Sequence, residues 1–256
     1  MSLQVRELLR HYGGVKALDG VSFEVPSGQC VALIGPNGAG KSTCFACLAG
    51  QQKPGAGEVV WRGQTLTALA PEARLALGVA RTFQVAQTFE ALTVLQNVQL
   101  VRAHAQLSWW DRLAARQATQ ALDVLAQVGL QAQAHSLVAD LPYGAKKRLE
   151  LAMALAGLPT QGERLLLLDE PAAGLAPSER ADMMALVRRL ADGGVTVLYT
   201  EHNMDAVFGV ADRVLVLMQG RLVADGTPEA VAQDPQVRER YLGQDFQLTG
   251  DAHARG

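Results

Sequence analysis

Residues 35–43 read Gly35-Pro36-Asn37-Gly38-Ala39-Gly40-Lys41-Ser42-Thr43, and this stretch, the P-loop below, decides the fold of the chain. It matches the pattern G-x-x-x-x-G-K-[ST], which wraps the phosphates of a nucleoside triphosphate. The glycines let several backbone N–H groups point at one anion, Lys41 can reach the β- and γ-phosphates, and the Ser42 hydroxyl is a hard oxygen ligand for Mg²⁺. An apolar strand at 30–34 and an apolar helix at 44–49 flank the motif, as it requires. The alternative interpretation is a glycine-rich turn that binds nothing.

The composition is that of a globular protein. The chain has 256 residues, 49% of them hydrophobic, and a formal net charge of −2. This length allows a sizeable core in one large domain or two small ones, and the charge gives no argument for nucleic acid. The first residues lack the apolar core of a signal peptide, and no apolar run is long enough to cross a membrane. We therefore expect a soluble, cytoplasmic chain that reaches a membrane only through a partner.

The cysteines do not form a disulfide framework in our interpretation, because Cys30, Cys44 and Cys47 are an odd number. Cys44 and Cys47 have the spacing of some metal and redox sites, but they lie inside a predicted helix without a second pair or a nearby histidine. We interpret them as small core residues on one helical face. Redox or metal chemistry is the alternative.

The order of apolar patterns predicts an α/β fold with a helical insert. Alternating residues around Gly13-Gly14 favour an antiparallel strand pair. Apolar residues at three- and four-residue spacing indicate helices over most of 92–158, with a new helix beginning near Ala145. The remaining predicted strands are 58–61, 165–168, 195–199 and a hairpin of 213–218 with 221–224; the pair near the N-terminus is 3–10 with 21–25, and a helix covers 177–191.

Polar side chains follow the predicted strands at one edge of the sheet. Asp169 and Glu170 end the leucine strand at 165–168, where Asp169 can orient Mg²⁺ through water and Glu170 can polarise a water for attack on the γ-phosphate. His202 follows the strand at 195–199 and can bind the γ-phosphate. Gln84 carries an amide oxygen, a hard donor suited to Mg²⁺. The alternatives are helix capping for the acids and an ordinary surface position for His202.

In this order the motifs resemble the ATP-binding subunit of an ABC transporter, over about Leu3 to Gly243. The resemblance implies ATP and Mg²⁺ as cofactors, with Ser42, Gln84 and Asp169 on the metal and Lys41, Glu170 and His202 in catalysis. It makes residues 35–43 the Walker A loop, 165–170 the Walker B strand, Gln84 the Q-loop residue and His202 the switch histidine. It also places Tyr12 where the family has an aromatic ring stacked on adenine. The alternative for Tyr12 is packing within the hairpin.

The family's LSGGQ signature has a divergent counterpart in Leu141-Pro142-Tyr143-Gly144-Ala145. The resemblance implies that Pro142, Tyr143 and Gly144 meet the ATP bound to the opposite subunit of a dimer. Proline cannot supply the hydroxyl of the usual serine. We therefore expect that contact to be made mainly by backbone N–H groups at the start of the following helix.

Several stretches are most similar to branched-chain amino acid importer ATPases, in the version with the longer helical insert. These are 79–84, 88–98, the Pro-Tyr-Gly signature, 170–175 and 201–204. Trp109-Trp110 in the insert is either a docking patch for a membrane subunit or part of the packing of the insert. The ending 241–246 is also similar to the lipopolysaccharide-export ATPase, and urea or short-chain amide importers use very similar ATPases. Substrate identity at this level therefore rests on analogy.

The resemblance implies a P-loop NTPase (RecA-like) core with an N-terminal antiparallel β-subdomain and an inserted α-helical subdomain. The expected division is one ABC ATPase domain, with the core at 1–91 and 159–243, the helical subdomain at 92–158 and a tail at 244–256. The implied partners are a second, identical or different ATPase subunit, membrane permease subunits and, indirectly, a substrate-binding protein, with no nucleic acid. The implied location is the cytoplasmic face of the cell membrane.

Two other classes of protein fit the sequence less well. A non-transport ABC ATPase in DNA repair or translation usually carries two ATPase domains or a long coiled coil, whereas this chain has one P-loop and no sustained heptads. A P-loop kinase or GTPase lacks support, because the sequence has no convincing Asn-Lys-x-Asp motif for guanine and no kinase lid.

Overall fold

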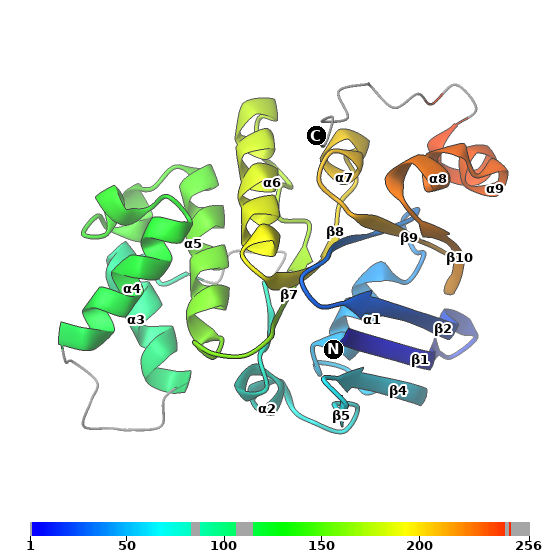
Figure 1. Ribbon diagram of the computed structural model, residues 1–256, viewed down its shortest axis with the longest axis horizontal. Coiled ribbons are helices and arrows are strands. Elements are labelled where there is room, and N and C mark those ends of the chain that lie inside the picture. The colour runs from blue at the N-terminus through cyan, green and yellow to red at the C-terminus, as the bar shows by residue number, and fades with distance from the viewer. Residues whose placement is uncertain (1, 83–87, 106–114, 244–245, 247–256) are drawn as a thin grey trace.

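A six-stranded sheet lies at the centre of the computed structural model, which describes residues 2–82, 88–105, 115–243 and 246 (Figure 1). The strand order is β10-β9-β3-β8-β7-β6, parallel except for the β9–β10 hairpin. The bounds are β3 (Cys30–Ile34), β6 (Val79–Arg81), β7 (Arg164–Asp169), β8 (Val195–Thr200), β9 (Arg213–Met218) and β10 (Arg221–Gly226). The predicted strands are present, and β6 is an additional one that the sequence patterns did not indicate.

The second sheet is the predicted N-terminal antiparallel one, in the order β2-β1-β4-β5. Its strands are β1 (Ser2–Tyr12), β2 (Val15–Pro26), β4 (Ala56–Trp61) and β5 (Gln64–Thr65). Helix α1 (Lys41–Leu48) packs with this sheet and with one face of the central sheet in a common core. β3 is buried on both faces, because Val31 and Leu33 enter that core while Cys30 and Ile34 enter the core on the other side. An unbroken apolar strand is what such a central position requires.

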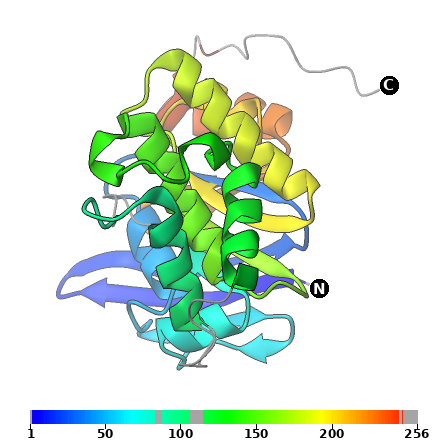
Figure 2. The same ribbon diagram turned by 90° about the vertical axis from the view of Figure 1, so that its left-hand side faces the viewer.

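The described part of the predicted helical stretch contains three α-helices, α3 (Val94–Ala105), α4 (Ala115–Gln127) and α5 (Tyr143–Gly157). They pack on one another beside the central sheet, and Figure 2 turns them toward the viewer. The helix predicted to begin near Ala145 is α5, which begins at Tyr143. Pro142 is the residue that precedes the first turn, since its fixed φ of −63° and ψ of 156° suit a helix cap, and α5 begins directly after it.

The remaining helices flank the core. They are α2 (Pro71–Ala76), α6 (Pro177–Asp192), α7 (Met204–Phe208), α8 (Pro228–Gln233) and α9 (Pro235–Val237), followed by a π-helical turn at Arg238–Leu242. Together these elements confirm the predicted α/β class with an antiparallel subdomain and a helical insert. Among the described residues, no helix combines the length and the apolar character needed to cross a membrane. Of the predicted tail at 244–256, only Phe246 lies within the described residues.

Candidate functional site

The P-loop joins β3 to α1 through a backbone that only glycine permits at two points. Gly35 has φ +148° and Gly40 has φ +107°. A Cβ atom at Gly35 would lie 2.0 Å from the Leu217 carbonyl oxygen, and one at Gly40 would lie 2.1 Å from the Ala17 carbonyl oxygen. The loop is therefore held between neighbouring backbone segments in a shape that side chains would prevent.

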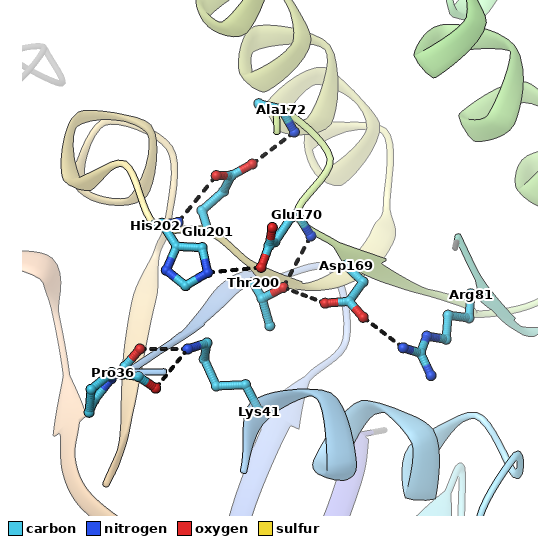
Figure 3. Close-up of polar contacts among 10 residues, drawn as sticks. Pro36, Lys41, Arg81, Asp169, Glu170, Ala172, Thr200, Glu201 and His202 are labelled. Carbon is cyan, nitrogen blue, oxygen red and sulfur yellow. Dashed lines mark hydrogen bonds and ion pairs between the residues drawn. The ribbon is translucent and has the colours of Figure 1, made fainter. Parts of the chain in front are cut away.

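Lys41, the first residue of α1, folds back over this loop. Its Nζ donates hydrogen bonds to the carbonyl oxygens of Gly35, at 2.5 Å, and Pro36, at 3.1 Å (Figure 3). Burial lowers the pKa of Lys41, and the nearby charges of Glu170 and Asp169 oppose that shift. The fold thus places the buried Lys41 ammonium group at the P-loop, where it is attracted by the charges of two nearby carboxylates.

Asp169, the last residue of β7, has partners on both carboxylate oxygens. Oδ1 accepts a hydrogen bond of 2.8 Å from the Thr200 hydroxyl, and Oδ2 accepts one of 2.6 Å from Nη2 of Arg81. Thr200 ends β8 directly opposite Asp169 in the strand register, and Arg81 ends β6 on the other side of β7. Two neighbouring parallel strands therefore fix the orientation of this buried carboxylate, because their carboxyl ends meet at one edge.

Glu170 follows in a backbone conformation that is rare for a residue with a side chain. Its φ is +51°, which costs of the order of 1 kcal/mol or more and is concentrated at functional sites. The backbone N–H of Glu170 donates to Thr200, with 3.2 Å to the carbonyl oxygen and 3.1 Å to the hydroxyl oxygen. Its carboxylate oxygen Oε1 lies 2.8 Å from Nε2 of His202. The Glu170 side chain points toward His202 and away from Arg81 (Figure 3).

Glu201 connects the two loops that carry these groups. Its buried carboxylate accepts the backbone N–H groups of Ala172, at 2.8 Å, and of His202, at 3.3 Å. Burial raises the pKa of Glu201, and the two backbone hydrogen bonds act against it. A carboxylate that binds both loops fixes the spacing between Glu170 and His202.

The structure brings Lys41, Asp169, Glu170 and His202 together at the carboxyl ends of β3, β7 and β8, as the sequence predicts. Among the described residues, no hydrogen bond or ion pair connects these groups with Tyr12 or with the signature. Tyr12 ends β1, is 42% exposed, and lies under the Arg10 guanidinium, 4.8 Å from the ring centroid. Gln84 and Trp109-Trp110 lie outside the described residues.

The signature residues lie at the beginning of α5. Pro142 is the cap, and the Tyr143 ring, 49% exposed, packs against Gly174. A Cβ atom at Gly144 would lie 2.8 Å from Oε1 of Glu179. The Tyr143 ring is thus about half exposed, and the missing Cβ atom at Gly144 leaves room for the Glu179 carboxylate.

Sequence reasoning missed Arg81, Thr200 and Glu201 as parts of this site. The signal that would have found Thr200 and Glu201 is the rule already used for His202, since all three follow or end the strand at 195–200. Arg81 ends β6, a three-residue strand without a readable pattern. The contact between Arg81 and Asp169 depends on the pairing of β6 with β7, which no local sequence pattern predicts.

The donor set suits a magnesium-bound phosphate. The Ser42 hydroxyl is exposed at the start of α1, and Asp169 is a carboxylate at the same edge of the sheet. Hydroxyl and carboxylate oxygens are ligands that Mg²⁺ prefers, and the P-loop backbone offers N–H groups to phosphate. No cluster of three histidine, cysteine or acidic side chains that would hold a metal by itself occurs within the described part of the chain. A cation here would need oxygen ligands from phosphate or water as well.

Comparisons with known proteins agree with this geometry. The family model "ABC transporter" matches residues 18–173, and the model "Branched-chain amino acid ATP-binding cassette transporter" matches residues 221–247. The chain is 37% identical over 254 residues to the high-affinity branched-chain amino acid transport ATP-binding protein LivG of Escherichia coli (strain K12), covering 94% of this chain and 98% of that protein. It is 38% identical over 254 residues to BraF of Pseudomonas aeruginosa, a protein with the same description, with the same coverage.

Two further similarities bear on function. The chain is 34% identical over 248 residues to the lipopolysaccharide export system ATP-binding protein LptB of Escherichia coli (strain K12), covering 96% of this chain and 99% of that one. A crystal structure of an ATP-binding cassette of an ABC transporter in its ADP conformation superposes with a TM-score of 0.83 at 30% identity, covering 95% of this chain and 100% of the other.

Proposed function

This chain belongs to the ABC transporter ATP-binding family, and from that membership we propose that it is the ATP-hydrolysing subunit of an importer for branched-chain or related amino acids. The observation that carries the proposal is the convergence of Lys41, Asp169, Glu170 and His202 beside a P-loop. The relatives named for branched-chain amino acid transport, together with the C-terminal family match, support the substrate class.

In the proposed mechanism the chain acts mainly by positioning and electrostatics. The backbone N–H groups of the P-loop and the Lys41 ammonium bind the β- and γ-phosphates. Ser42, Gln84 and, through water, Asp169 would hold Mg²⁺, which would supply positive charge beside the phosphates. Glu170 orients the attacking water, and His202 binds the γ-phosphate and holds the Glu170 carboxylate at 2.8 Å.

The proposed partners are a second ATPase subunit and two membrane permease subunits that hold the pair on the inner face of the membrane. The exposed Tyr143 ring and the beginning of α5 support a dimer in which Pro142, Tyr143 and Gly144 meet the partner's ATP. Tyr12 is proposed to stack on adenine, since its ring is exposed at the end of β1.

A pocket between the core and the helical subdomain supports permease docking. It has a volume of about 320 Å³ and an apolar lining that includes Leu75, Val79, Val101 and Met153. Its position next to Arg81 places it beside the residue that holds Asp169. We propose that a permease segment with apolar side chains enters this pocket, so that movement of the helices can be transmitted to the membrane subunits.

The variant Glu170→Gln tests the catalytic part of the proposal. We expect it to bind ATP normally while kcat for hydrolysis falls by about 10²- to 10⁴-fold, because the amide cannot act as a base. Glu229→Gln, an exposed carboxylate in the first turn of α8, is the matched control and should hydrolyse ATP normally. Near-normal turnover in Glu170→Gln would remove Glu170 from this role.

Lipopolysaccharide export is the second candidate, since one relative with that description covers nearly the whole chain. Co-purification followed by an ATPase assay separates the two. Stimulation by an amino-acid-binding protein loaded with leucine or isoleucine, in complex with permeases, supports import. Stimulation by lipopolysaccharide, or by urea or amides in the corresponding assay, would reject the amino acid assignment.

A further inference from the structure

The end of the P-loop contacts two other segments of the chain, so that three segments meet at one place. They are the beginning of β2, the P-loop residues Ala39 and Gly40, and the turn of the β9–β10 hairpin at Gln219-Gly220. The Gly220 N–H donates to the carbonyl oxygen of Ala39 at 3.0 Å, and the Gly220 carbonyl oxygen accepts the N–H of Asp19 at 2.8 Å. The backbone of Gly220 therefore connects the phosphate loop to the β1–β2 hairpin.

The absence of side chains allows this junction to close. A Cβ atom at Gly220 would lie 2.7 Å from the Lys16 carbonyl oxygen and 3.0 Å from the Ala17 carbonyl oxygen. The Ala17 carbonyl oxygen is also the atom that a Cβ at Gly40 would meet at 2.1 Å. The backbone of β2 thus packs closely against the P-loop on one side and against the hairpin turn on the other.

An ion pair fastens the same junction through side chains. Arg221, the first residue of β10, donates to Oδ2 of Asp19 from Nε at 3.0 Å and from Nη2 at 2.8 Å. Lys16 and His11, both in the β1–β2 hairpin, also face Asp19, with nitrogen–oxygen distances of 3.5 and 3.7 Å. The hydrogen bond from Arg221 is the largest of the effects that lower the pKa of Asp19. The carboxylate brings basic side chains of the hairpin and of β10 to one point.

Tyr12 lies at the end of this hairpin. Asp19 pairs with Leu9 in the strand register, and Tyr12 is three residues beyond Leu9 on β1. At the usual rise of a strand, Tyr12 lies about 10 Å from Leu9 along the strand. We propose that Asp19 and Arg221 are positioning residues that hold the hairpin, and with it the Tyr12 ring, at a fixed place relative to the P-loop. This inference rests on the proposed function of Tyr12 in binding adenine, and it adds which residues set the adenine end of the site.

Two ligands differ in whether they contact the hairpin. Inorganic tripolyphosphate has no base and contacts only the phosphate cradle, whereas ATP also uses the hairpin. Loss of the ion pair should therefore weaken ATP binding and leave tripolyphosphate binding unchanged. The expected loss is about two- to fivefold, the size that a partly exposed pair can contribute.

The test measures the equilibrium dissociation constants of both ligands by titration calorimetry, in EDTA so that hydrolysis does not interfere. The variants are Asp19→Asn, Arg221→Gln and Tyr12→Ala. Asp225→Asn is the matched control, because Asp225 forms a similar forked pair with Arg213 on the same β9–β10 hairpin, at 2.5 and 2.6 Å. Thermal unfolding of each variant verifies that it is folded, and Arg221→Gln, whose arginine side chain is 68% exposed, serves if Asp19→Asn does not fold.

We expect Tyr12→Ala to weaken ATP most, Asp19→Asn and Arg221→Gln to weaken it in the same direction, and all variants to bind tripolyphosphate like the parent. An equal loss for both ligands in Asp19→Asn would place its effect on the cradle and overturn the inference. Normal ATP binding in both ion-pair variants, with a loss in Tyr12→Ala, would overturn the inference and leave the proposed function intact. Normal ATP binding in Tyr12→Ala would reject the adenine role of Tyr12 and the inference with it.

Discussion

Replacement of Thr200 by valine tests how the acidic pair is held. The Thr200 hydroxyl donates a hydrogen bond of 2.8 Å to Asp169 Oδ1 and accepts one of 3.1 Å from the Glu170 N–H. Thr200 is only 1% exposed. Valine has nearly the same shape, so the change removes the hydroxyl without opening a cavity. Because the Asp169 side chain is 5% exposed, water cannot easily replace the lost donor.

The expected loss of stability follows from the negative charge of the acceptor, the Asp169 carboxylate. A hydrogen bond to an ionised group contributes about 1.5–3 kcal/mol to the free energy of unfolding. For a chain of this length that corresponds to a fall in Tm of roughly 4–10 °C. The Glu170 N–H keeps its bond to the Thr200 carbonyl oxygen at 3.2 Å, so we expect the Glu170 backbone to stay in place. The loss of orientation should fall on Asp169, and the Mg²⁺ concentration for half-maximal ATPase activity should rise.

The assay is urea unfolding together with a Mg²⁺ titration of ATP hydrolysis. Thr200→Ser is the matched control, since it keeps the hydroxyl and should retain most of the stability and the Mg²⁺ response. A Thr200→Val protein as stable as the parent, with an unchanged Mg²⁺ requirement, would refute the reasoning. Equal losses in the valine variant and in the serine variant, which keeps the hydroxyl, would show that the lost stability does not come from the hydroxyl.

Three further outcomes are expected. Arg74, 1% exposed, donates to backbone carbonyl oxygens at the end of α1 and in the loop between β5 and α2, so Arg74→Met should lower the free energy of unfolding by about 3 kcal/mol or more in urea, and an unchanged value would contradict this. Burial raises the pKa of Cys30 to about 12 and also raises those of Cys44 and Cys47, so iodoacetamide at pH 8 should label them only after unfolding; rapid labelling of the native protein would be inconsistent with buried, protonated thiols. The raised pKa of Glu201 means that the folded state holds a proton more tightly than the unfolded state, so the stability contributed by this group falls as pH rises above 4.5 toward the folded pKa. Glu201→Gln should therefore gain stability relative to the parent as pH rises above 4.5 in urea unfolding, and a pH-independent difference would exclude this linkage.

Local sequence patterns predicted the elements whose form depends on neighbouring residues. The P-loop pattern specified a strand, a tight loop and a helix because its glycines and lysine act within one short segment. The leucine run at 165–168 predicted a strand buried on both faces, and the Asp-Glu pair after it predicted the edge at which the site lies. Short helices such as α7 and α9 were not predicted, since they span too few residues to show a helical period.

By itself, the sequence determined the α/β class, the phosphate cradle and the four side chains expected beside it, because motif spacing and apolar periodicity are properties of one stretch of chain. Only the tertiary structure decided which residues support them. Arg81 binds Asp169 across 88 positions, and Arg221 binds Asp19 across 202. Such partners depend on the order of strands in the sheet and on the close approach of loops. No local pattern predicts them, because the packing of the whole chain sets the distance between segments that are far apart in sequence.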